Sequence, residues 1–362
     1  MKIHFQLMLI IFFSIVWSNM IYSSNFISAD NPNIQFFGRW DFSDKLHPKF
    51  SWPGVYVYAE FTGTKIGIRL NDKTSYYNIY IDGNFYKVFH GTEDGESEYI
   101  LAENLENKNH TIRFSRRNIS FDEVFSFGGF ILDDGAELLN PLPKPERKIE
   151  FIGDSYTAAE SNESDKQELE WEARFPVTNI DKGFAALIAN HFNAQYTTTC
   201  RSGIGMVCDW QGDTTFAMPK FFDRTLMDLP EPKWDFKNWT PDVVFICLGL
   251  NDNSGLKNKD GEVSEEKSES FRKEYHSFLK TIRENYPGAK IILVASYSEW
   301  GRKNIKQVYD EEISTGNKDV FYIQFDYFEG GYVAYGHPTV ETHKKMADQI
   351  IQSIEPLNLF AH

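Results

Sequence analysis

The pattern of hydrophobic residues changes once along this chain, and that change limits the folds open to it. Residues 34–138 hold about seven short runs rich in β-branched and aromatic residues, separated by turn signals such as Asp82-Gly83. Three prolines within Pro141–Pro145 then form a stiff connector without helix. Beyond them, runs typical of strands alternate with runs typical of helices. The division predicts two domains of different class, which also suits a length of 362 residues.

The first domain is predicted to be an all-β sandwich of the jelly-roll kind. Polar and apolar residues alternate in several of its runs, as in residues 76–81, and short strands at this spacing favour two packed antiparallel sheets. We place this domain at residues 25–140 and a proline-rich linker at residues 141–147.

The second domain, residues 148–362, is predicted to be a three-layer α/β/α structure around a parallel sheet. The runs KIEFI, VVFICLGL and KIILVA are continuous and apolar, as strands buried on both faces are. Between them, residues 265–286 repeat apolar side chains at helical spacing, with Ser264 as cap and Pro287-Gly288 as stop. Strands that alternate with helices imply parallel strands with crossover helices.

The first residues resemble a secretory signal peptide. Lys2 supplies positive charge, an apolar stretch runs from Phe5 to Trp17, and the small residues Ser23 and Ser24 follow. We assign residues 1–24 to this peptide and expect an exported, soluble protein, secreted or at the cell surface. An uncleaved membrane anchor is the alternative.

Charge and cysteine content exclude several classes of partner. A net charge of −15 argues against binding to nucleic acid or to an anionic membrane, and a basic cluster such as Arg116-Arg117 is too short to change this. No Cys or His cluster has zinc-ligand spacing, so we expect neither a metal nor a cofactor. Cys200 and Cys208 could pair in an oxidising compartment, whereas Cys247 is predicted to be a buried thiol. We expect a monomer.

Polar residues follow three predicted strands of the second domain, where ligands of open parallel sheets bind. They are Ser155, Ser202-Gly203 and Asn251-Asp252, and His337 follows the last predicted strand. Each has an ordinary structural explanation, since Ser caps helices and Gly and Asn-Asp form turns. Their coincidence at the strand ends of one sheet weakens that explanation.

Ester hydrolysis by serine needs a base, a group that holds the base in one tautomer, and donors aimed at the oxyanion. Ser155 and His337 could supply the nucleophile and the base. The N–H groups of Ser155 and Gly203 and the side-chain amide of Asn251 could supply the donors. Glycine would let the backbone approach closely at Gly203.

These residues also carry a resemblance to a known family. GDS at Ser155, Gly203, G-x-N-D at Asn251 and the late His337-Pro338 resemble the four blocks of the SGNH or GDSL-type hydrolases. The stretches SGIGMVCDWQGDT and GHPTVETHKKMA, and the order of the domains, are similar to carbohydrate esterase family 2, a set of polysaccharide deacetylases. The resemblance implies a flavodoxin-like SGNH domain with Ser155 as nucleophile and His337 as base. It further implies oxyanion donors at Ser155, Gly203 and Asn251.

One position departs from the SGNH pattern. Many SGNH enzymes carry the triad Asp three residues before the His, and that position is Ala334 here. Some members of family 2 resemble Ser-His dyads in which a main-chain carbonyl replaces the acid, so we expect a carbonyl of residues 334–336 on His337. Asp326 or Glu329 is the alternative acid.

The sequence offers fewer signals for the residues that contact substrate. Trp210 and Trp300, placed in loops near the rim, could stack on sugar rings. Residues 158–176 are acidic, include Glu160, and are predicted to form a solvated loop that favours neutral polysaccharides. We therefore expect a secreted acetyl esterase acting on xylan or glucomannan. A carbohydrate-binding protein without activity and an acetyltransferase are the alternatives.

Overall fold

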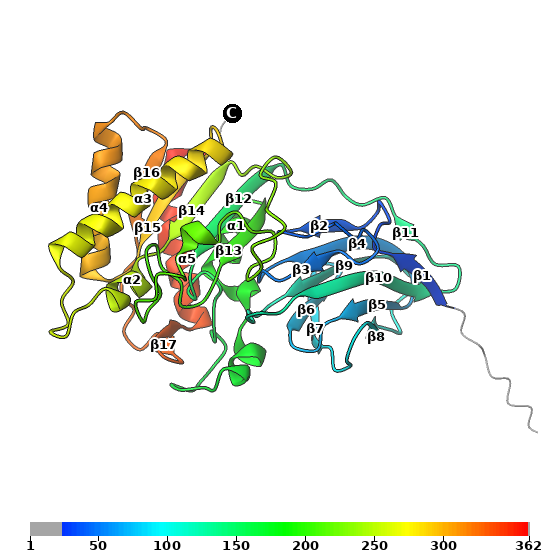
Figure 1. The fold of residues 1–362 in the computed structure, drawn as a ribbon. Helices are drawn as coiled ribbons and strands as arrows, with labels where there is room; N and C mark the ends of the chain where they lie inside the picture. The colour runs from blue at the N-terminus through cyan, green and yellow to red at the C-terminus, as the bar shows by residue number, and fades with distance from the viewer. Residues whose placement is uncertain (1–23, 361–362) are drawn as a thin grey trace, which may run out of the picture.

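The computed structural model describes residues 24–360 and contains two domains that lie side by side (Figure 1). The predicted signal peptide lies outside the described residues, except for Ser24, which begins the first strand. Within the described part of the chain, no helix is both long and apolar enough to cross a membrane. The domain limits given above stay predictions.

The N-terminal domain is a sandwich of two antiparallel sheets. Strands β3 to β10 occur in the orders β3-β10-β5-β8 and β4-β9-β6-β7, which is the arrangement of a jelly roll. Side chains such as Phe61, Phe127 and Phe130 fill the space between the sheets. The strands are β1 Ser24–Ser28, β2 Gln35–Phe37, β3 Lys49–Phe50, β4 Tyr56–Gly63, β5 Ile66–Asn71, β6 Tyr76–Ile81, β7 Asn84–His90, β8 Ser97–Ala102, β9 Lys108–Arg116, β10 Phe125–Asp133 and β11 Leu138–Leu139.

The C-terminal domain is built on a parallel sheet in the order β13-β12-β14-β15-β16. Helices α1 and α5 pack on one face and α3 and α4 on the other, which confirms the predicted three-layer class (Figure 1). The strands are β12 Arg147–Gly153, β13 Ala194–Cys200, β14 Val243–Cys247, β15 Lys290–Ala295 and β16 Val320–Gln324, followed by a small ribbon, β17 Tyr332–Val333 and β18 His337–Pro338. The helices are α1 Phe184–His191, α2 Leu250–Gly255, α3 Glu265–Asn285, α4 Glu299–Ser314 and α5 Val340–Ile354.

Local sequence signals explain where helix α3 begins and ends. The Ser264 side chain accepts a hydrogen bond from the backbone N–H of Lys267, and α3 ends at Asn285, just before Pro287. The helix α4 was not predicted. Ser298 caps it, and Trp300 therefore lies in its first turn rather than in a loop, which corrects the prediction for that residue.

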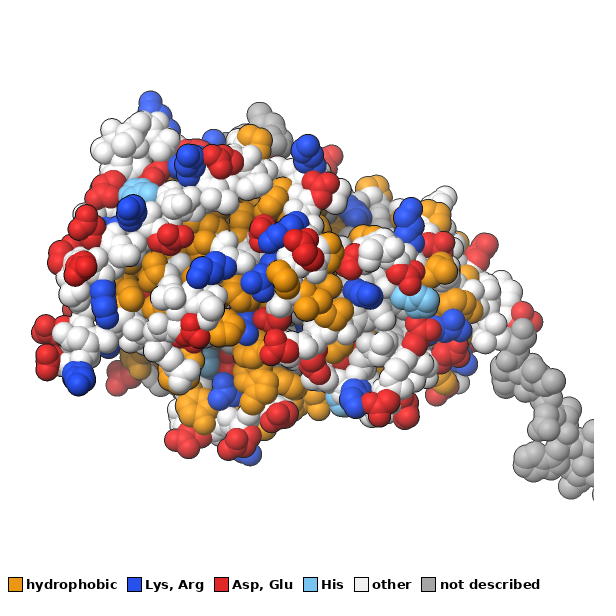
Figure 2. Space-filling view, viewed as in Figure 1, with side chains coloured by type: hydrophobic (Ala, Val, Ile, Leu, Met, Phe, Trp, Pro, Cys, Tyr) orange, Lys and Arg blue, Asp and Glu red, His pale blue; other side chains and the backbone are white. Residues whose placement is uncertain are grey.

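The two domains are joined by buried polar contacts. Arg39 of the sandwich donates to Glu150 Oε1 on β12 at 2.8 Å and to the carbonyl oxygens of Phe222 and Arg224 at 2.5 and 2.9 Å. Both charged side chains are almost fully buried. In the view of Figure 2, hydrophobic side chains gather in the middle of the molecule, over the junction of the domains. The sandwich is thus packed tightly on the C-terminal domain.

One member of the basic pair noted in the sequence, Arg117, belongs to this junction. Arg117 contacts Glu163 and donates to the carbonyl oxygen of Thr178 at 2.9 Å, so it holds the segment that follows β12. Arg116 is buried inside the sandwich domain. Neither side chain forms a basic surface.

All three cysteines are free and buried thiols. Cys200 and Cys208, which could have paired, are not bonded to each other. Burial raises the pKa of the Cys208 thiol to about 12, so this thiol is protonated at neutral pH.

Candidate active site

A cleft of about 740 Å³ opens at the carboxyl ends of the parallel strands. All four residues predicted as nucleophile, base or oxyanion donors line it, namely Ser155, Gly203, Asn251 and His337. They come from the segments after β12, β13 and β14 and from β18, so the fold brings together residues that lie far apart in the sequence. This is the edge of the sheet at which open parallel sheets bind ligands.

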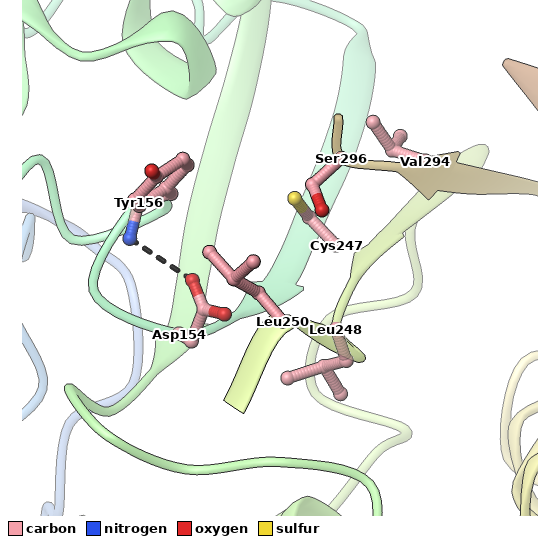
Figure 3. A pocket seen from close by; sticks show the side chains of 7 residues that line it. All are labelled: Asp154, Tyr156, Cys247, Leu248, Leu250, Val294 and Ser296. Carbon is pink, nitrogen blue, oxygen red and sulfur yellow. Dashed lines mark hydrogen bonds between the residues drawn. The ribbon is translucent and has the colours of Figure 1, made fainter. Parts of the chain in front are cut away.

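Ser155 lies in the turn that follows β12. A Cβ on Gly153 would come within 2.0 Å of Thr157 Oγ1, so only glycine fits where this strand turns away from the sheet. Asp154 Oδ1 accepts a hydrogen bond from the Tyr156 N–H at 3.0 Å, which holds the turn that carries Ser155 (Figure 3). Burial, together with nearby Asp252, raises the pKa of Asp154 to about 7. A small cavity of about 10 Å³, the space of one water molecule, adjoins Asp154.

Two backbone N–H groups at the cleft are free to bind an oxyanion. Among the hydrogen bonds of residues 24–360, none uses the N–H of Ser155 or of Gly203 as donor. Gly203 has φ +79°, and a Cβ there would lie 3.1 Å from the Trp210 ring, so this position requires glycine. The backbone at Gly203 is therefore open to a ligand.

The side-chain amide of Asn251 already has partners. Its Nδ2 donates to the carbonyl oxygen of Ile204 at 2.9 Å and to Asp154 Oδ2 at 3.3 Å. Both amide hydrogens are therefore engaged within the protein. An oxyanion could replace only the longer bond, the one to Asp154, so the predicted donor role of Asn251 requires this exchange when substrate binds.

Replacing Asn251 by alanine tests that role. We expect kcat for acetyl ester hydrolysis to fall about 10²-fold with little change in KM, because an oxyanion donor acts in the transition state. The matched control is Asn253→Ala, which removes the next amide of α2. Asn253 donates to Ser298 Oγ at 3.0 Å and does not line the cleft. Steady-state kinetics of both variants measure the effect. A similar loss of activity in Asn251→Ala and Asn253→Ala would refute the donor role of Asn251.

The neighbouring Asp252, which the sequence placed at a strand end without a specific role, holds the loop after β13. Its carboxylate accepts from the N–H groups of Met206 and Val207 at 2.8 and 2.7 Å. Burial nevertheless raises its pKa to about 6. Through this loop, Asp252 sets the position of Gly203.

His337 is held by a tight backbone turn. Its Nδ1 lies 2.5 Å from the carbonyl oxygen of Ala334, and because a carbonyl only accepts, Nδ1 carries the proton and Nε2 of the neutral ring is free as a base. Ala334, Tyr335 and Gly336 have φ of +40°, +64° and +87°, a strained sequence of left-handed residues that creates this contact. The predicted main-chain partner is confirmed. The alternative acid Asp326 instead lies 3.5 Å from Arg302.

No hydrogen bond joins Ser155 Oγ to His337 Nε2 among the described residues, although both line the cleft. Such bonds often form only when substrate binds, so the pair remains compatible with nucleophile and base.

The acidic segment after Ser155 is not uniformly solvated, which corrects the prediction for Glu160. Its carboxylate is 2% exposed, lines the cleft and accepts from Arg174 Nη1 at 2.7 Å. Glu160 Oε2 also lies 3.7 Å from His337 Nε2. Later acidic residues of the segment are exposed as predicted, namely Asp165, Glu168, Glu170 and Glu172. The sequence could not reveal the burial of Glu160, because its contacts with Arg174 and His337 form only in the folded chain.

Of the two tryptophans predicted to contact substrate, the cleft contains one. Trp210 lines it and is 56% exposed. Trp300 does not line it, packs on Phe271 and donates from its indole to Ser268 Oγ at 2.9 Å. Sequence reasoning missed other aromatic residues of the cleft wall, namely Phe121, Trp171, Tyr297 and Tyr335. Phe121 comes from the sandwich and stacks on Trp171, with ring centroids 4.6 Å apart.

Trp210→Ala is expected to weaken binding of a polymeric substrate without changing the chemical step. Loss of one stacking face should raise KM for acetylated polysaccharide about five- to tenfold. With a small ester such as p-nitrophenyl acetate, kcat/KM should remain near that of the native protein. An equal loss on both substrates would indicate instead that Trp210 supports the Gly203 loop.

Comparison with known proteins agrees with this geometry. A family model described as carbohydrate esterase 2 N-terminal matches residues 36–143, and one described as GDSL-like lipase/acylhydrolase matches residues 149–350. Cellulase/esterase CelE of Acetivibrio thermocellus is 31% identical over 338 residues, which cover 90% of this chain and 40% of that protein. The chain thus spans less than half the length of CelE.

Two further relatives are similar over most of their length. An acetylxylan esterase/glucomannan deacetylase of Cellvibrio japonicus is 30% identical over 256 residues, or 68% of each chain. The solved structure of a family two carbohydrate esterase from Clostridium thermocellum in complex with cellohexaose has a TM-score of 0.81 and 28% identity. It covers 90% of this chain and all of that one. The fold and the site define a GDSL-type hydrolase domain behind a β-sandwich. The chain belongs to carbohydrate esterase family 2.

Proposed function

We propose that this protein is a secreted serine esterase that removes O-acetyl groups from plant cell-wall polysaccharide, xylan or glucomannan. The observation that carries the proposal is the arrangement of Ser155, His337 and two unengaged backbone N–H groups around one cleft. The deacetylase names of the Cellvibrio relatives support the choice of substrate.

The chemistry follows from the residues of the cleft. His337 Nε2 takes the hydroxyl proton of Ser155 as Oγ bonds to the acetyl carbonyl carbon. The oxyanion is bound by the N–H groups of Ser155 and Gly203 and by the Asn251 amide, which exchanges its bond to Asp154 for the oxyanion. The sugar oxygen then leaves with that proton. Water, activated by His337, hydrolyses the acyl-enzyme and releases acetate.

The test is acetate release from acetylated xylan and acetylated glucomannan by the mature protein, with and without a chelator. We expect release that survives chelation, since no step above uses a metal. Absence of release from both polysaccharides, by protein shown to be folded, would refute the proposal.

Two alternatives remain, a glycan-binding protein in which the sandwich binds and an acetyltransferase that uses the residues of the cleft. The Clostridium relative was solved with cellohexaose bound, so a protein that binds glycans without hydrolysing them is the second candidate. It predicts glycan binding with no acetate release. An acetyltransferase would form acetylated sugar when an acceptor sugar is added, which product analysis would detect.

A further inference from the structure

Glu160 is placed where its charge acts on the proposed base. Its backbone N–H donates to the carbonyl oxygen of Ser155 at 3.0 Å, so its position is tied to that of the nucleophile. Its carboxylate lies inside the cleft, 2% exposed, with Oε2 3.7 Å from His337 Nε2. At that distance Glu160 makes no hydrogen bond to Nε2 and leaves it open to Ser155.

The carboxylate is kept ionised by its surroundings. Burial by itself raises the pKa of Glu160. The positive charge of protonated His337, the nearby Ser202 hydroxyl and the hydrogen bond from Arg174 outweigh this effect, so the pKa lies below the usual value. Arg174 Nη1 binds Oε1 at 2.7 Å and leaves Oε2 facing the imidazole. The carboxylate is therefore negatively charged when His337 is protonated, which is the state of the ring that this inference concerns.

The imidazolium formed during the reaction otherwise lacks a counter-charge. When the Ser155 proton moves to Nε2, the ring becomes positive, and its Nδ1 contacts only the neutral carbonyl of Ala334. The other groups facing His337 are Tyr156, whose hydroxyl donates to the Gly336 carbonyl oxygen at 2.8 Å, and His343. Burial lowers the pKa of His343 to about 3, so it stays neutral. Arg174 is paired with Glu160.

We propose that Glu160 is a positioning residue that stabilises protonated His337 from the Nε2 side, in place of a triad carboxylate at Nδ1. It neither gains nor loses a proton, because the proton passes from Ser155 to His337 and then to the leaving sugar oxygen. The kinetic part of this inference rests on the proposed esterase function, whereas its electrostatic part does not.

The primary test is an NMR titration of His337 in ¹³C-histidine-labelled protein, with His337→Gln used to assign the signal. In Glu160→Gln the midpoint should move to lower pH by roughly one unit, because a negative charge that favours the protonated ring is lost. Glu329→Gln, the same change at an exposed acid before His337, should leave the midpoint unchanged. An unchanged midpoint in folded Glu160→Gln would overturn the proposal, whether or not the protein hydrolyses esters.

Kinetics supply the second readout. In Glu160→Gln, kcat for p-nitrophenyl acetate should fall about tenfold, and the acidic limb of the kcat/KM profile should move to lower pH. A loss confined to KM would contradict the inference. If Glu160→Gln does not fold, Glu160→Asp replaces it, because aspartate keeps the charge but holds it farther from His337. In Glu160→Asp the titration midpoint and the acidic limb of kcat/KM must move in the same direction by a smaller amount. Release of acetate by the native protein and its absence in Ser155→Ala would leave the proposed function intact even where Glu160 proved inert.

Discussion

Ser155→Ala is expected to reduce acetate release by at least about 10⁴-fold while the protein stays folded. The reason is that Ser155 Oγ is the proposed nucleophile, so its removal abolishes the proposed acyl-enzyme and leaves only weak catalysis by the oxyanion donors. Binding of the polysaccharide should persist, because the change removes one oxygen atom from a cleft of about 740 Å³. Acetate assays and calorimetric titration with acetylated xylan measure the two effects separately.

A matched control for this substitution is Ser277→Ala, which removes an exposed hydroxyl of α3 outside the cleft. It should retain the activity of the native protein. Ser155→Ala with more than a tenth of that activity would show that another group is the nucleophile. A loss of binding together with activity would point to a disturbed cleft instead.

The second large effect is expected at the junction of the domains. Arg39→Met leaves Glu150 buried without its counter-charge, and we expect a loss of about 3–5 kcal/mol in the free energy of unfolding. Guanidinium unfolding, followed by tryptophan fluorescence and by circular dichroism, measures it.

The double variant Arg39→Met/Glu150→Gln separates charge from packing. Because the buried negative charge is then removed as well, the double variant should be more stable than Arg39→Met alone. Strictly additive losses would mean that the two side chains act independently, which their 2.8 Å contact contradicts.

Regular elements were predictable because their signals are local. The long helix α3 carries its own cap at Ser264 and its own stop at Pro287, and the buried strands read as continuous apolar runs. The positions of Ser155, Gly203, Asn251 and His337 at one edge of the sheet were predictable in the same way, because each follows a predicted strand.

What the sequence could not show depends on contacts between distant segments. Glu160 resembles its acidic neighbours, and its burial follows only from Arg174 and from the turn that carries His337. Trp300 looked like a rim aromatic until α4 placed it on Phe271. The engagement of the Asn251 amide by Asp154 and Ile204 also depends on the tertiary structure.

The stacking of Phe121 on Trp171 makes one wall of the cleft a shared product of both domains. If the proposed function holds, Phe121 can be altered to suit another polysaccharide while Ser155 and His337 are left unchanged. A chimaera that exchanges the first domain between family members should inherit part of the donor's substrate preference. A domain that carries neither Ser155 nor His337 thus shapes the cleft in which both residues lie.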